Sequence, residues 1–301
     1  MRKATVFIAL CVCLTLAACA PAAEPSGGDS GSSTRSTASH PVDELTVDGT
    51  YVDTHPEPYS WARDHSLIAH GFGGLGEYRV TNCFEAFEAN YRAGHRVFEV
   101  DLVFTSDGAL VARHDWEEYM YAFLGQNVED PAHVMSLEEF EALPIHGTNR
   151  PMTIENIVQL MRAYPDIWIV TDTKSAEEAD VLAAMQEIVD AVGDDEVLLE
   201  RFIVQVYDEP MLGYVREVHE FDNIIYTLYQ ITGTKEAAAA FAAANGIGAV
   251  TFPETMWSAE YVALLDSQGL IAAVHTVNDE QQVQAYQDSG VDVIYTDFLT
   301  P

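Results

Sequence analysis

Two carboxylates and a histidine lie close together in residues 97–115, which read VFEVDLVFTSDGALVARHD. Because strand side chains alternate between two faces, Glu99 and Asp101 are expected to point the same way. Two carboxylates inside a Val/Phe/Leu run are costly to bury unless they share a divalent cation. His114 ends a second apolar run, and an imidazole beside such a cation can act as a general acid or base. The segment therefore predicts a metal site with a proton-transfer group next to it.

A second histidine follows another apolar run. Residues 67–74 read LIAHGFGG, in which His70 precedes a glycine-rich turn. Glycines let backbone N–H groups approach an anion closely. Taken singly these signals are weak, because a histidine at a strand end is usually structural or exposed, and a Glu-x-Asp pair is also typical of an edge strand that carries charge against aggregation. Their occurrence in order between residues 67 and 115 favours one shared site.

The order of these motifs resembles the glycerophosphodiester phosphodiesterase family. The family pattern runs His-Arg-Gly, a Pro-Glu-Asn-Thr-like helix start, Glu-x-Asp, Thr-x-Asp-Gly and His-Asp. The corresponding residues here are His70-Gly71, Val80-Thr81-Asn82-Cys83, Glu99-Val100-Asp101, Thr105-Ser106-Asp107-Gly108 and His114-Asp115. Two positions depart from the pattern: no arginine follows His70, and Thr81 stands in place of the glutamate. These departures indicate a divergent branch, closer to phosphodiesterases that resemble phosphoinositide phospholipase C.

The resemblance implies further site residues. In the run IWIVTDTK, Asp172 and Lys174 share a face by alternation. The family has Glu-x-Lys here, which implies Asp172 as the third metal ligand beside Glu99 and Asp101, and Lys174 as a substrate contact at the phosphate. A strand-edge ion pair is the alternative for Asp172 and Lys174. All three ligands are hard oxygen donors, so the expected metal is Ca²⁺ or Mg²⁺.

The resemblance also implies a reaction. His70 and His114 are expected to share the roles of catalytic acid and base, with a neighbouring hydroxyl of the substrate attacking first. The implied activity is that of a phosphoric diester hydrolase that converts small-molecule glycerophosphodiesters to glycerol 3-phosphate and an alcohol, in a metal-dependent reaction. Two alternatives stay open. One is a lipid phosphodiesterase that resembles sphingomyelinase D or phosphoinositide phospholipase C, and the other is a surface lipoprotein that keeps the fold only for binding.

Strands and helices alternate from about residue 66 to the end, which is typical of a parallel sheet with helical crossovers. Seven helices are expected between eight strands near 66–70, 97–103, 167–173, 202–207, 223–229, 248–252, 271–277 and 291–296. Residues 50–301 therefore predict one α/β domain, a (β/α)8 TIM barrel with a small insertion after strand 2 at 116–150. The segment 50–65 is expected to fill the barrel bottom or the place of a missing last helix. The candidate site residues all fall at strand C-terminal ends, where barrel enzymes carry their chemistry.

The first residues predict export and lipid attachment. Arg2 and Lys3 precede an apolar stretch that ends Leu16-Ala17-Ala18-Cys19. This is typical of a signal peptide over residues 1–18, and its ending resembles a bacterial lipobox with Cys19 as the lipidated residue. An ordinary signal peptide with an incidental Cys19 is the alternative. Residues 19–49 are rich in Ser, Gly, Pro and Thr and predict a disordered tether, so the expected location is the outer face of the bacterial cell membrane.

The charge of the chain limits its partners. The formal net charge is −34. So acidic a chain argues against nucleic acid as a partner and against adsorption to anionic lipid. The lipid anchor, rather than surface charge, is therefore expected to hold the protein at the membrane.

Overall fold

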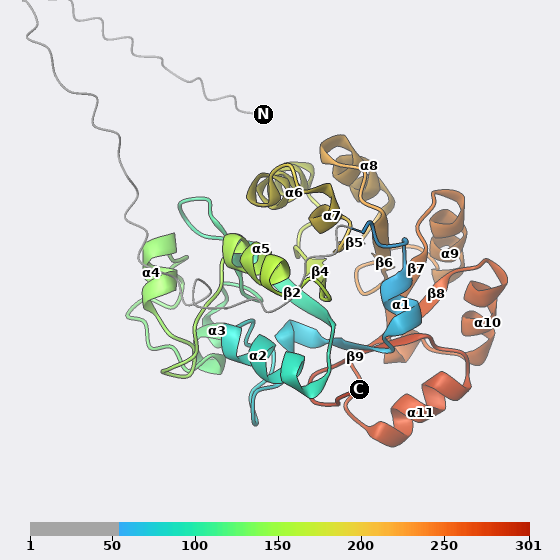
Figure 1. Ribbon diagram of the computed structural model, residues 1–301, viewed down its shortest axis with the longest axis horizontal. Coiled ribbons are helices and arrows are strands. Elements are labelled where there is room, and N and C mark those ends of the chain that lie inside the picture. Colours follow the sequence, from blue (N-terminus) through green and yellow to red (C-terminus); the bar gives the residue numbers. More distant parts are fainter. Residues whose placement is uncertain (1–53) are drawn as a thin grey trace, which may run out of the picture. The chain divides into compact units, whose positions relative to one another are not determined.

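A computed structural model describes residues 54–301, and its centre is a closed barrel of eight parallel strands (Figure 1). The barrel strands are β1 (Leu67–Ala69), β2 (Val97–Phe104), β4 (Trp168–Asp172), β5 (Phe202–Val206), β6 (Asn223–Thr227), β7 (Ala249–Pro253), β8 (Ile271–His275) and β9 (Val293–Thr296). Pairing of β1 with both β9 and β2 closes the barrel. The predicted (β/α)8 TIM barrel is confirmed.

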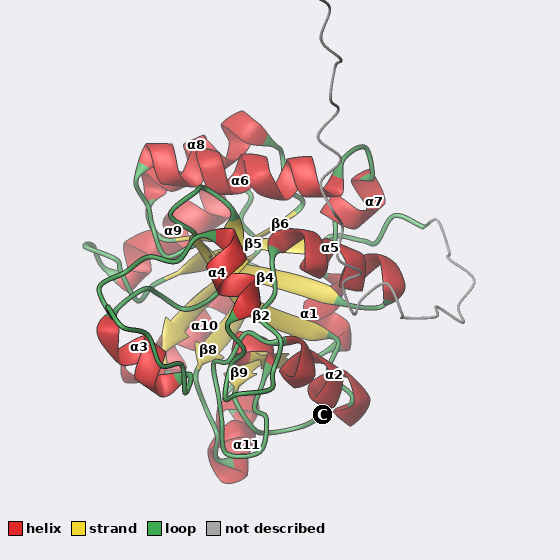
Figure 2. Cartoon of the chain, turned by 90° about the vertical axis from the view of Figure 1, so that its left-hand side faces the viewer, coloured by secondary structure: helices red, strands yellow, loops and turns green. Residues whose placement is uncertain are grey.

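Helices alternate with these strands and surround the barrel (Figure 2). The barrel helices are α2 (Phe84–Ala93), α5 (Ile154–Ala163), α6 (Glu178–Val192), α8 (Glu209–Val218), α9 (Lys235–Ala244), α10 (Ala259–Ser267) and α11 (Glu280–Asp288). Shorter elements are α7 (Glu196–Leu199) and the 3-10 turns η2 (His70–Phe72) and η3 (Glu254–Met256). Polar N-cap side chains start several barrel helices, because an oxygen there accepts a hydrogen bond from an otherwise unpaired backbone N–H. Asp208 and Asp279 accept such bonds at α8 and α11.

The insertion predicted after strand 2 at residues 116–150 follows β3 (Leu110–Ala112), a short strand antiparallel to β2. It contains α3 (Glu118–Phe123) and α4 (Leu137–Ala142) and leads into α5. In the turn between β2 and β3, the Asp107 carboxylate accepts hydrogen bonds from the Thr105 hydroxyl at 2.7 Å and the Leu137 N–H at 2.9 Å. The Thr-x-Asp-Gly motif therefore fastens the insertion to the barrel.

The inward-facing side chains change character along the barrel axis. Toward the strand N-termini they are apolar and form one buried cluster: Ile68, Val97, Trp168, Val170, Ile203, Ile225, Ala249, Ala273, Val293 and Tyr295, joined by Trp61. Two residues further along the same strands the inward positions are polar: Glu99, Asp172, Gln205, Thr227, Thr251 and His275. The outward positions pack against the helices in a second, larger apolar cluster. The polar layer marks the C-terminal end of the barrel, where barrel enzymes carry their active sites.

Helix α1 (Ser60–Asp64) closes the opposite end of the barrel. Trp61 is fully buried in the inner apolar cluster. Its Nε1–H and the Tyr59 N–H both donate to Asn223 Oδ1, at 3.2 and 2.7 Å, on the first residue of β6. The Gly248 N–H donates to the Tyr59 hydroxyl at 2.7 Å, just before β7 begins. The described part of the segment 50–65 thus fills the barrel bottom, one of its two expected places.

Replacing this indole tests how much the plug contributes to stability. The substitution Trp61→Ala is expected to lower the free energy of unfolding by about 3–5 kcal/mol, because it leaves a large cavity in a close-packed interior. The control Trp257→Ala removes an indole that is 38% exposed and is expected to cost less than about 1 kcal/mol. Chemical denaturation measures both values. Equal losses for the two variants would contradict the assigned role of α1.

The predicted signal peptide (1–18), the lipid attachment at Cys19 and the tether (19–49) lie outside the described residues. Within residues 54–301, none of the helices has both the length and the apolar character that a membrane span requires.

Candidate active site

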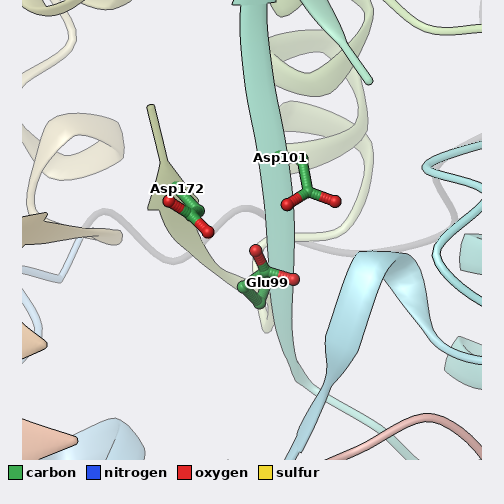
Figure 3. A group of neighbouring side chains, drawn as sticks. All are labelled: Glu99, Asp101 and Asp172. Atoms are coloured by element: carbon green, nitrogen blue, oxygen red, sulfur yellow. The ribbon is translucent and has the colours of Figure 1, made fainter. Parts of the chain in front are cut away.

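Three carboxylates meet at the C-terminal end of the barrel (Figure 3). Glu99 and Asp101 lie on β2, and Asp172 ends the neighbouring strand β4, where it pairs with Asp101. One oxygen from each carboxylate lies within 4.8 Å of the others, and all three residues are buried. Buried carboxylates this close repel each other and lose hydration, and a hard divalent cation offsets both costs. The three predicted ligands therefore come together as a donor set that fits Ca²⁺ or Mg²⁺.

The pKa shifts of the clustered carboxyl groups are those expected of a cation-binding site. Burial and the neighbouring Asp101 carboxylate raise the pKa of Glu99 to about 8. Burial also opposes ionisation of Asp101, but the nearby Lys174 ammonium and the His114 imidazole outweigh it and lower the pKa of Asp101 to about 2. Asp101 is thus ionised through its cationic neighbours, while burial and the Asp101 charge oppose the ionisation of Glu99.

Lys174 lies directly against these carboxylates. Its Nζ forms ion pairs with Asp101 Oδ1 and with Asp172 Oδ2, the latter at 2.6 Å. Its backbone is left-handed, with φ of 63°, and its N–H donates to the Tyr207 hydroxyl at 3.1 Å. The same hydroxyl donates to Asp172 Oδ1 at 2.5 Å. A positive φ at a non-glycine residue costs conformational energy and is typical of functional sites. The ammonium is therefore held at the site by both its backbone and its ion pairs.

His70 begins η2, directly after β1. Its Nδ1 lies 2.8 Å from Asp297 Oδ1, and its Nε2 lies 4.0 Å from Glu99 Oε2. The Asn278 amide donates to the other oxygen of Asp297 at 2.7 Å, which fixes that carboxylate. Burial lowers the basicity of the imidazole, but Glu99, Asp297 and Asp101 outweigh it and raise the pKa of His70 to about 9. One ring nitrogen is thus oriented by a carboxylate, while the other faces the carboxylate cluster, an arrangement suited to proton transfer.

The loop between His70 and α2 is hydrogen-bonded to β2 near both of its ends. The Gly71 N–H donates to Glu99 Oε2 at 2.7 Å. At the other end of the loop, the Asn82 amide donates to Asp101 Oδ2 at 2.7 Å and accepts from the Asp101 N–H at 3.0 Å. Gly71 has a φ of 58°, and a Cβ there would lie 2.6 Å from Val80 Cα. The absence of an arginine after His70 therefore has a local reason, because this loop conformation requires glycine at position 71.

His114 lies two residues beyond β3, just before the insertion at 116–150. Its Nδ1 lies 2.6 Å from Asp115 Oδ2. The Tyr119 hydroxyl, on α3, donates to the same carboxylate, as does the Glu117 N–H at 2.7 Å. His114 thus repeats the arrangement of His70, with Nδ1 held by a carboxylate, and it is close enough to Asp101 to lower the pKa of that group. Both predicted histidines lie at the same end of the barrel as the carboxylates.

A cavity of about 260 Å³ adjoins the carboxylates. It is lined by His70, Glu99, Asp172, Gln205, Thr227, Tyr229, His275, Thr276 and Tyr295. No prediction from the sequence gave a role in the site to Gln205 or Thr227, or to Asn82 and Asp297, which hold the site residues in place. Asn82 belongs to the quoted helix-start motif, and Gln205 and Thr227 each lie two residues beyond an inward apolar residue. Strand alternation applied to every barrel strand would have placed these two side chains inside.

A protein-family model described as the glycerophosphoryl diester phosphodiesterase family matches residues 73–300. The chain belongs to this family. The resemblance stated from the motifs is thereby confirmed, and the chain is assigned to the phosphoric diester hydrolases. Among curated proteins none matches the chain.

Solved structures of the family share the fold. A protein of Silicibacter pomeroyi described as a glycerophosphoryl diester phosphodiesterase is 23% identical, with a TM-score of 0.59 over 77% of this chain and 90% of that one. A glycerophosphodiester phosphodiesterase of Parabacteroides distasonis is 18% identical, with a TM-score of 0.61 over 77% and 92%. A phosphodiesterase of Oleispira antarctica, solved in complex with the product sn-glycerol 3-phosphate, is 15% identical, with a TM-score of 0.61 over 79% and 95%.

Proposed function

We propose that this chain is a metal-dependent phosphodiesterase that hydrolyses glycerophosphodiesters to glycerol 3-phosphate and an alcohol. The observation that carries the proposal is the meeting of three buried carboxylates within 4.8 Å at one end of the barrel. His70 Nε2 lies 4.0 Å from Glu99 Oε2, and His114 is close enough to Asp101 to lower the pKa of that carboxyl group. Membership of the family supports this substrate class, as does the sn-glycerol 3-phosphate bound to the Oleispira antarctica relative.

Glu99, Asp101 and Asp172 are proposed to hold Ca²⁺ or Mg²⁺. When bound, the cation neutralises a phosphodiester oxygen and stabilises the negative charge of the transition state. Lys174 adds a second positive charge at the phosphate, because its ammonium already lies at the same carboxylates. Both charges would act in a buried site, where electrostatic interactions are less screened than in water.

His70 and His114 are proposed to move the protons. One imidazole accepts the proton of the attacking hydroxyl, and the other donates a proton to the leaving oxygen. Asp297 and Asp115 hold the Nδ1 atoms at 2.8 and 2.6 Å, which leaves each Nε2 for the substrate. By analogy with the family, a neighbouring hydroxyl of the substrate attacks phosphorus first, and water then opens the resulting cyclic phosphate.

A substrate panel tests this proposal. The full chain is assayed with glycerophosphocholine, lysophosphatidylcholine, sphingomyelin and phosphatidylinositol, in Mg²⁺, in Ca²⁺ and in EDTA. We expect glycerol 3-phosphate from glycerophosphocholine only when a divalent cation is present, with ³¹P NMR reporting any cyclic phosphate. Turnover of sphingomyelin or phosphatidylinositol alone would replace the proposal with a lipid phosphodiesterase. No turnover in either cation would favour a lipoprotein that only binds.

The proposed location is the outer face of the bacterial cell membrane, with Cys19 as the lipid attachment residue. This part of the proposal is supported by the sequence of residues 1–49 alone.

A further inference from the structure

Arg79 lies at the rim of the candidate active site, in the loop between His70 and α2. Its Nη1 lies 3.9 Å from Asp297 Oδ2, and the other oxygen of this carboxylate lies 2.8 Å from His70 Nδ1. The Asp297 side chain is 4% exposed, whereas the Arg79 side chain is 55% exposed. Arg79 does not line the cavity beside the three carboxylates. Its guanidinium therefore lies outside that cavity, next to the carboxylate that orients His70.

The Arg79 guanidinium lacks the partners that the other cationic side chains have. Within residues 54–301, every other lysine and arginine side chain donates at least one hydrogen bond, such as Arg150 to Glu85 at 2.6 Å and Arg162 to the Val192 carbonyl at 2.8 Å. Arg79 has one ion pair, and at 3.9 Å it is too long for a hydrogen bond. A guanidinium carries five N–H donors. In a chain with a net charge of −34, these donors are free for a ligand at the mouth of the site.

The backbone on both sides of Arg79 is fixed. Leu75 and Tyr78 exchange two backbone hydrogen bonds, at 2.8 and 3.1 Å, which close a tight turn just before Arg79. Val80, the next residue, has a φ of 51°. A left-handed conformation is costly at a β-branched residue, and strain of this kind is typical of functional segments. The loop therefore holds Arg79 at the rim at a conformational cost.

An oxyanion is the ligand that fits this group. A guanidinium can donate two parallel hydrogen bonds to a phosphate or a carboxylate. The scissile phosphate is expected deeper in the site, at Lys174 and the proposed metal ligands, and the glycerol half of a glycerophosphodiester is uncharged. A second anionic group can therefore only belong to the alcohol half of the substrate. An alcohol that projects out of the cavity past His70 would bring that group to Arg79.

We propose that Arg79 binds an anionic group, a phosphate or a carboxylate, on the alcohol half of the substrate. The inference rests on the proposed phosphodiesterase function and narrows its substrate class to glycerophosphodiesters that carry a second negative charge. So acidic a protein repels such substrates elsewhere on its surface, and Arg79 offsets this repulsion at the mouth of the site. A cationic alcohol such as choline would meet a like charge there, so Arg79 also selects against it.

The substitution Arg79→Gln tests the proposal with two substrates that differ by one phosphate. For glycerophosphoglycerophosphoglycerol, we expect initial-rate kcat/KM to fall about 3- to 10-fold, mainly through KM, an effect between those of an exposed ion pair and a buried charged hydrogen bond. For glycerophosphoglycerol, which lacks the second phosphate, the loss is expected to stay below about 2-fold. The readout is the ratio of the two kcat/KM values, because a disturbed fold or a displaced His70 lowers both values equally.

Arg63→Gln is the matched control. The Arg63 side chain is also exposed, but it lies on α1 at the opposite end of the barrel, where it donates to the Pro58 carbonyl at 3.3 Å. This variant removes the same charge from the protein and is expected to keep the wild-type ratio. An unchanged ratio in Arg79→Gln, or an equal change of the ratio in both variants, would overturn the proposal. Equal losses on the two substrates in Arg79→Gln would place its action at the scissile phosphate or His70 instead.

A third substrate identifies the kind of anion. Glycerophosphoserine carries a carboxylate in place of the second phosphate, so a loss in Arg79→Gln confined to one of the two anionic substrates assigns the site to that anion. A wild-type protein that turns over none of the substrates would refute the proposed function. Calorimetry with glycerophosphoglycerophosphoglycerol in Mg²⁺ would then test Arg79 alone. Weaker binding in Arg79→Gln than in Arg63→Gln supports the anion site, and equal binding or no binding overturns it.

Discussion

Replacing either His70 or His114 by alanine is expected to lower kcat for a glycerophosphodiester by about 10²- to 10⁴-fold. The Nδ1 atom of His70 lies within hydrogen-bond distance of Asp297, and that of His114 within hydrogen-bond distance of Asp115. Each imidazole can therefore accept or donate a proton through its Nε2 atom. Removing one of them leaves the attacking hydroxyl or the leaving oxygen without its proton-transfer partner. Steady-state kinetics measures the loss, and a thermal melt checks that each variant is folded.

His133→Ala is the matched control for both histidines. The His133 imidazole also pairs with a carboxylate, Glu139 at 2.9 Å, but both side chains are exposed on the insertion and neither lines the catalytic cavity. This variant is expected to keep wild-type kcat. Full activity in His114→Ala would remove His114 from the mechanism and leave the second proton transfer to another group.

Removing the divalent cation is expected to reduce activity by at least about 10²-fold, since charge stabilisation by a bound metal is worth several kcal/mol. The reason is the cluster of Glu99, Asp101 and Asp172, in which burial and mutual repulsion leave Glu99 with a raised pKa. The protein is stripped with EDTA, desalted and assayed before and after addition of Mg²⁺ or Ca²⁺. Activity is expected to return with one or both ions.

The same treatment has a readout that does not depend on turnover. A cation at 100 times its Kd stabilises the folded protein by about 2.7 kcal/mol, which raises the melting temperature. Asp101→Asn is expected to weaken this shift, because it removes one charged ligand. Glu139→Gln, a change to an exposed carboxylate outside the cluster, is expected to keep the full shift. An identical shift in both variants would mean that the ion binds elsewhere.

The barrel could be predicted from the sequence because each of its strands is a short apolar run between helical segments. The run IWIVTDTK shows this: its apolar start predicted a buried parallel strand, and residues 168–172 form β4. The position of the segment 50–65 was harder to predict, since nothing local to Trp61 specifies which end of a barrel this segment closes. That depends on the Asn223 amide, 162 residues away in the chain.

Glu99 and Asp101 could be predicted to lie on one face by strand alternation, and the resemblance to the family's Glu-x-Lys motif implied Asp172 as the third ligand. The partner of His70 could not be predicted, since Asp297 is 227 residues away and reaches it only through the closure of β1 against β9. Gln205 and Thr227 were missed for another reason. Single polar residues at strand ends are common, and only their shared cavity makes them informative.

The most direct test of the central claim is a calorimetric titration of Mg²⁺ or Ca²⁺ into the stripped protein, with activity assayed at each step. We predict one ion bound per chain, activity that rises in proportion to occupancy, and the loss of both in a variant that combines Asp101→Asn with Asp172→Asn. Full activity in the stripped protein, or unchanged ion binding in the double variant, would contradict a catalytic cation held by these carboxylates.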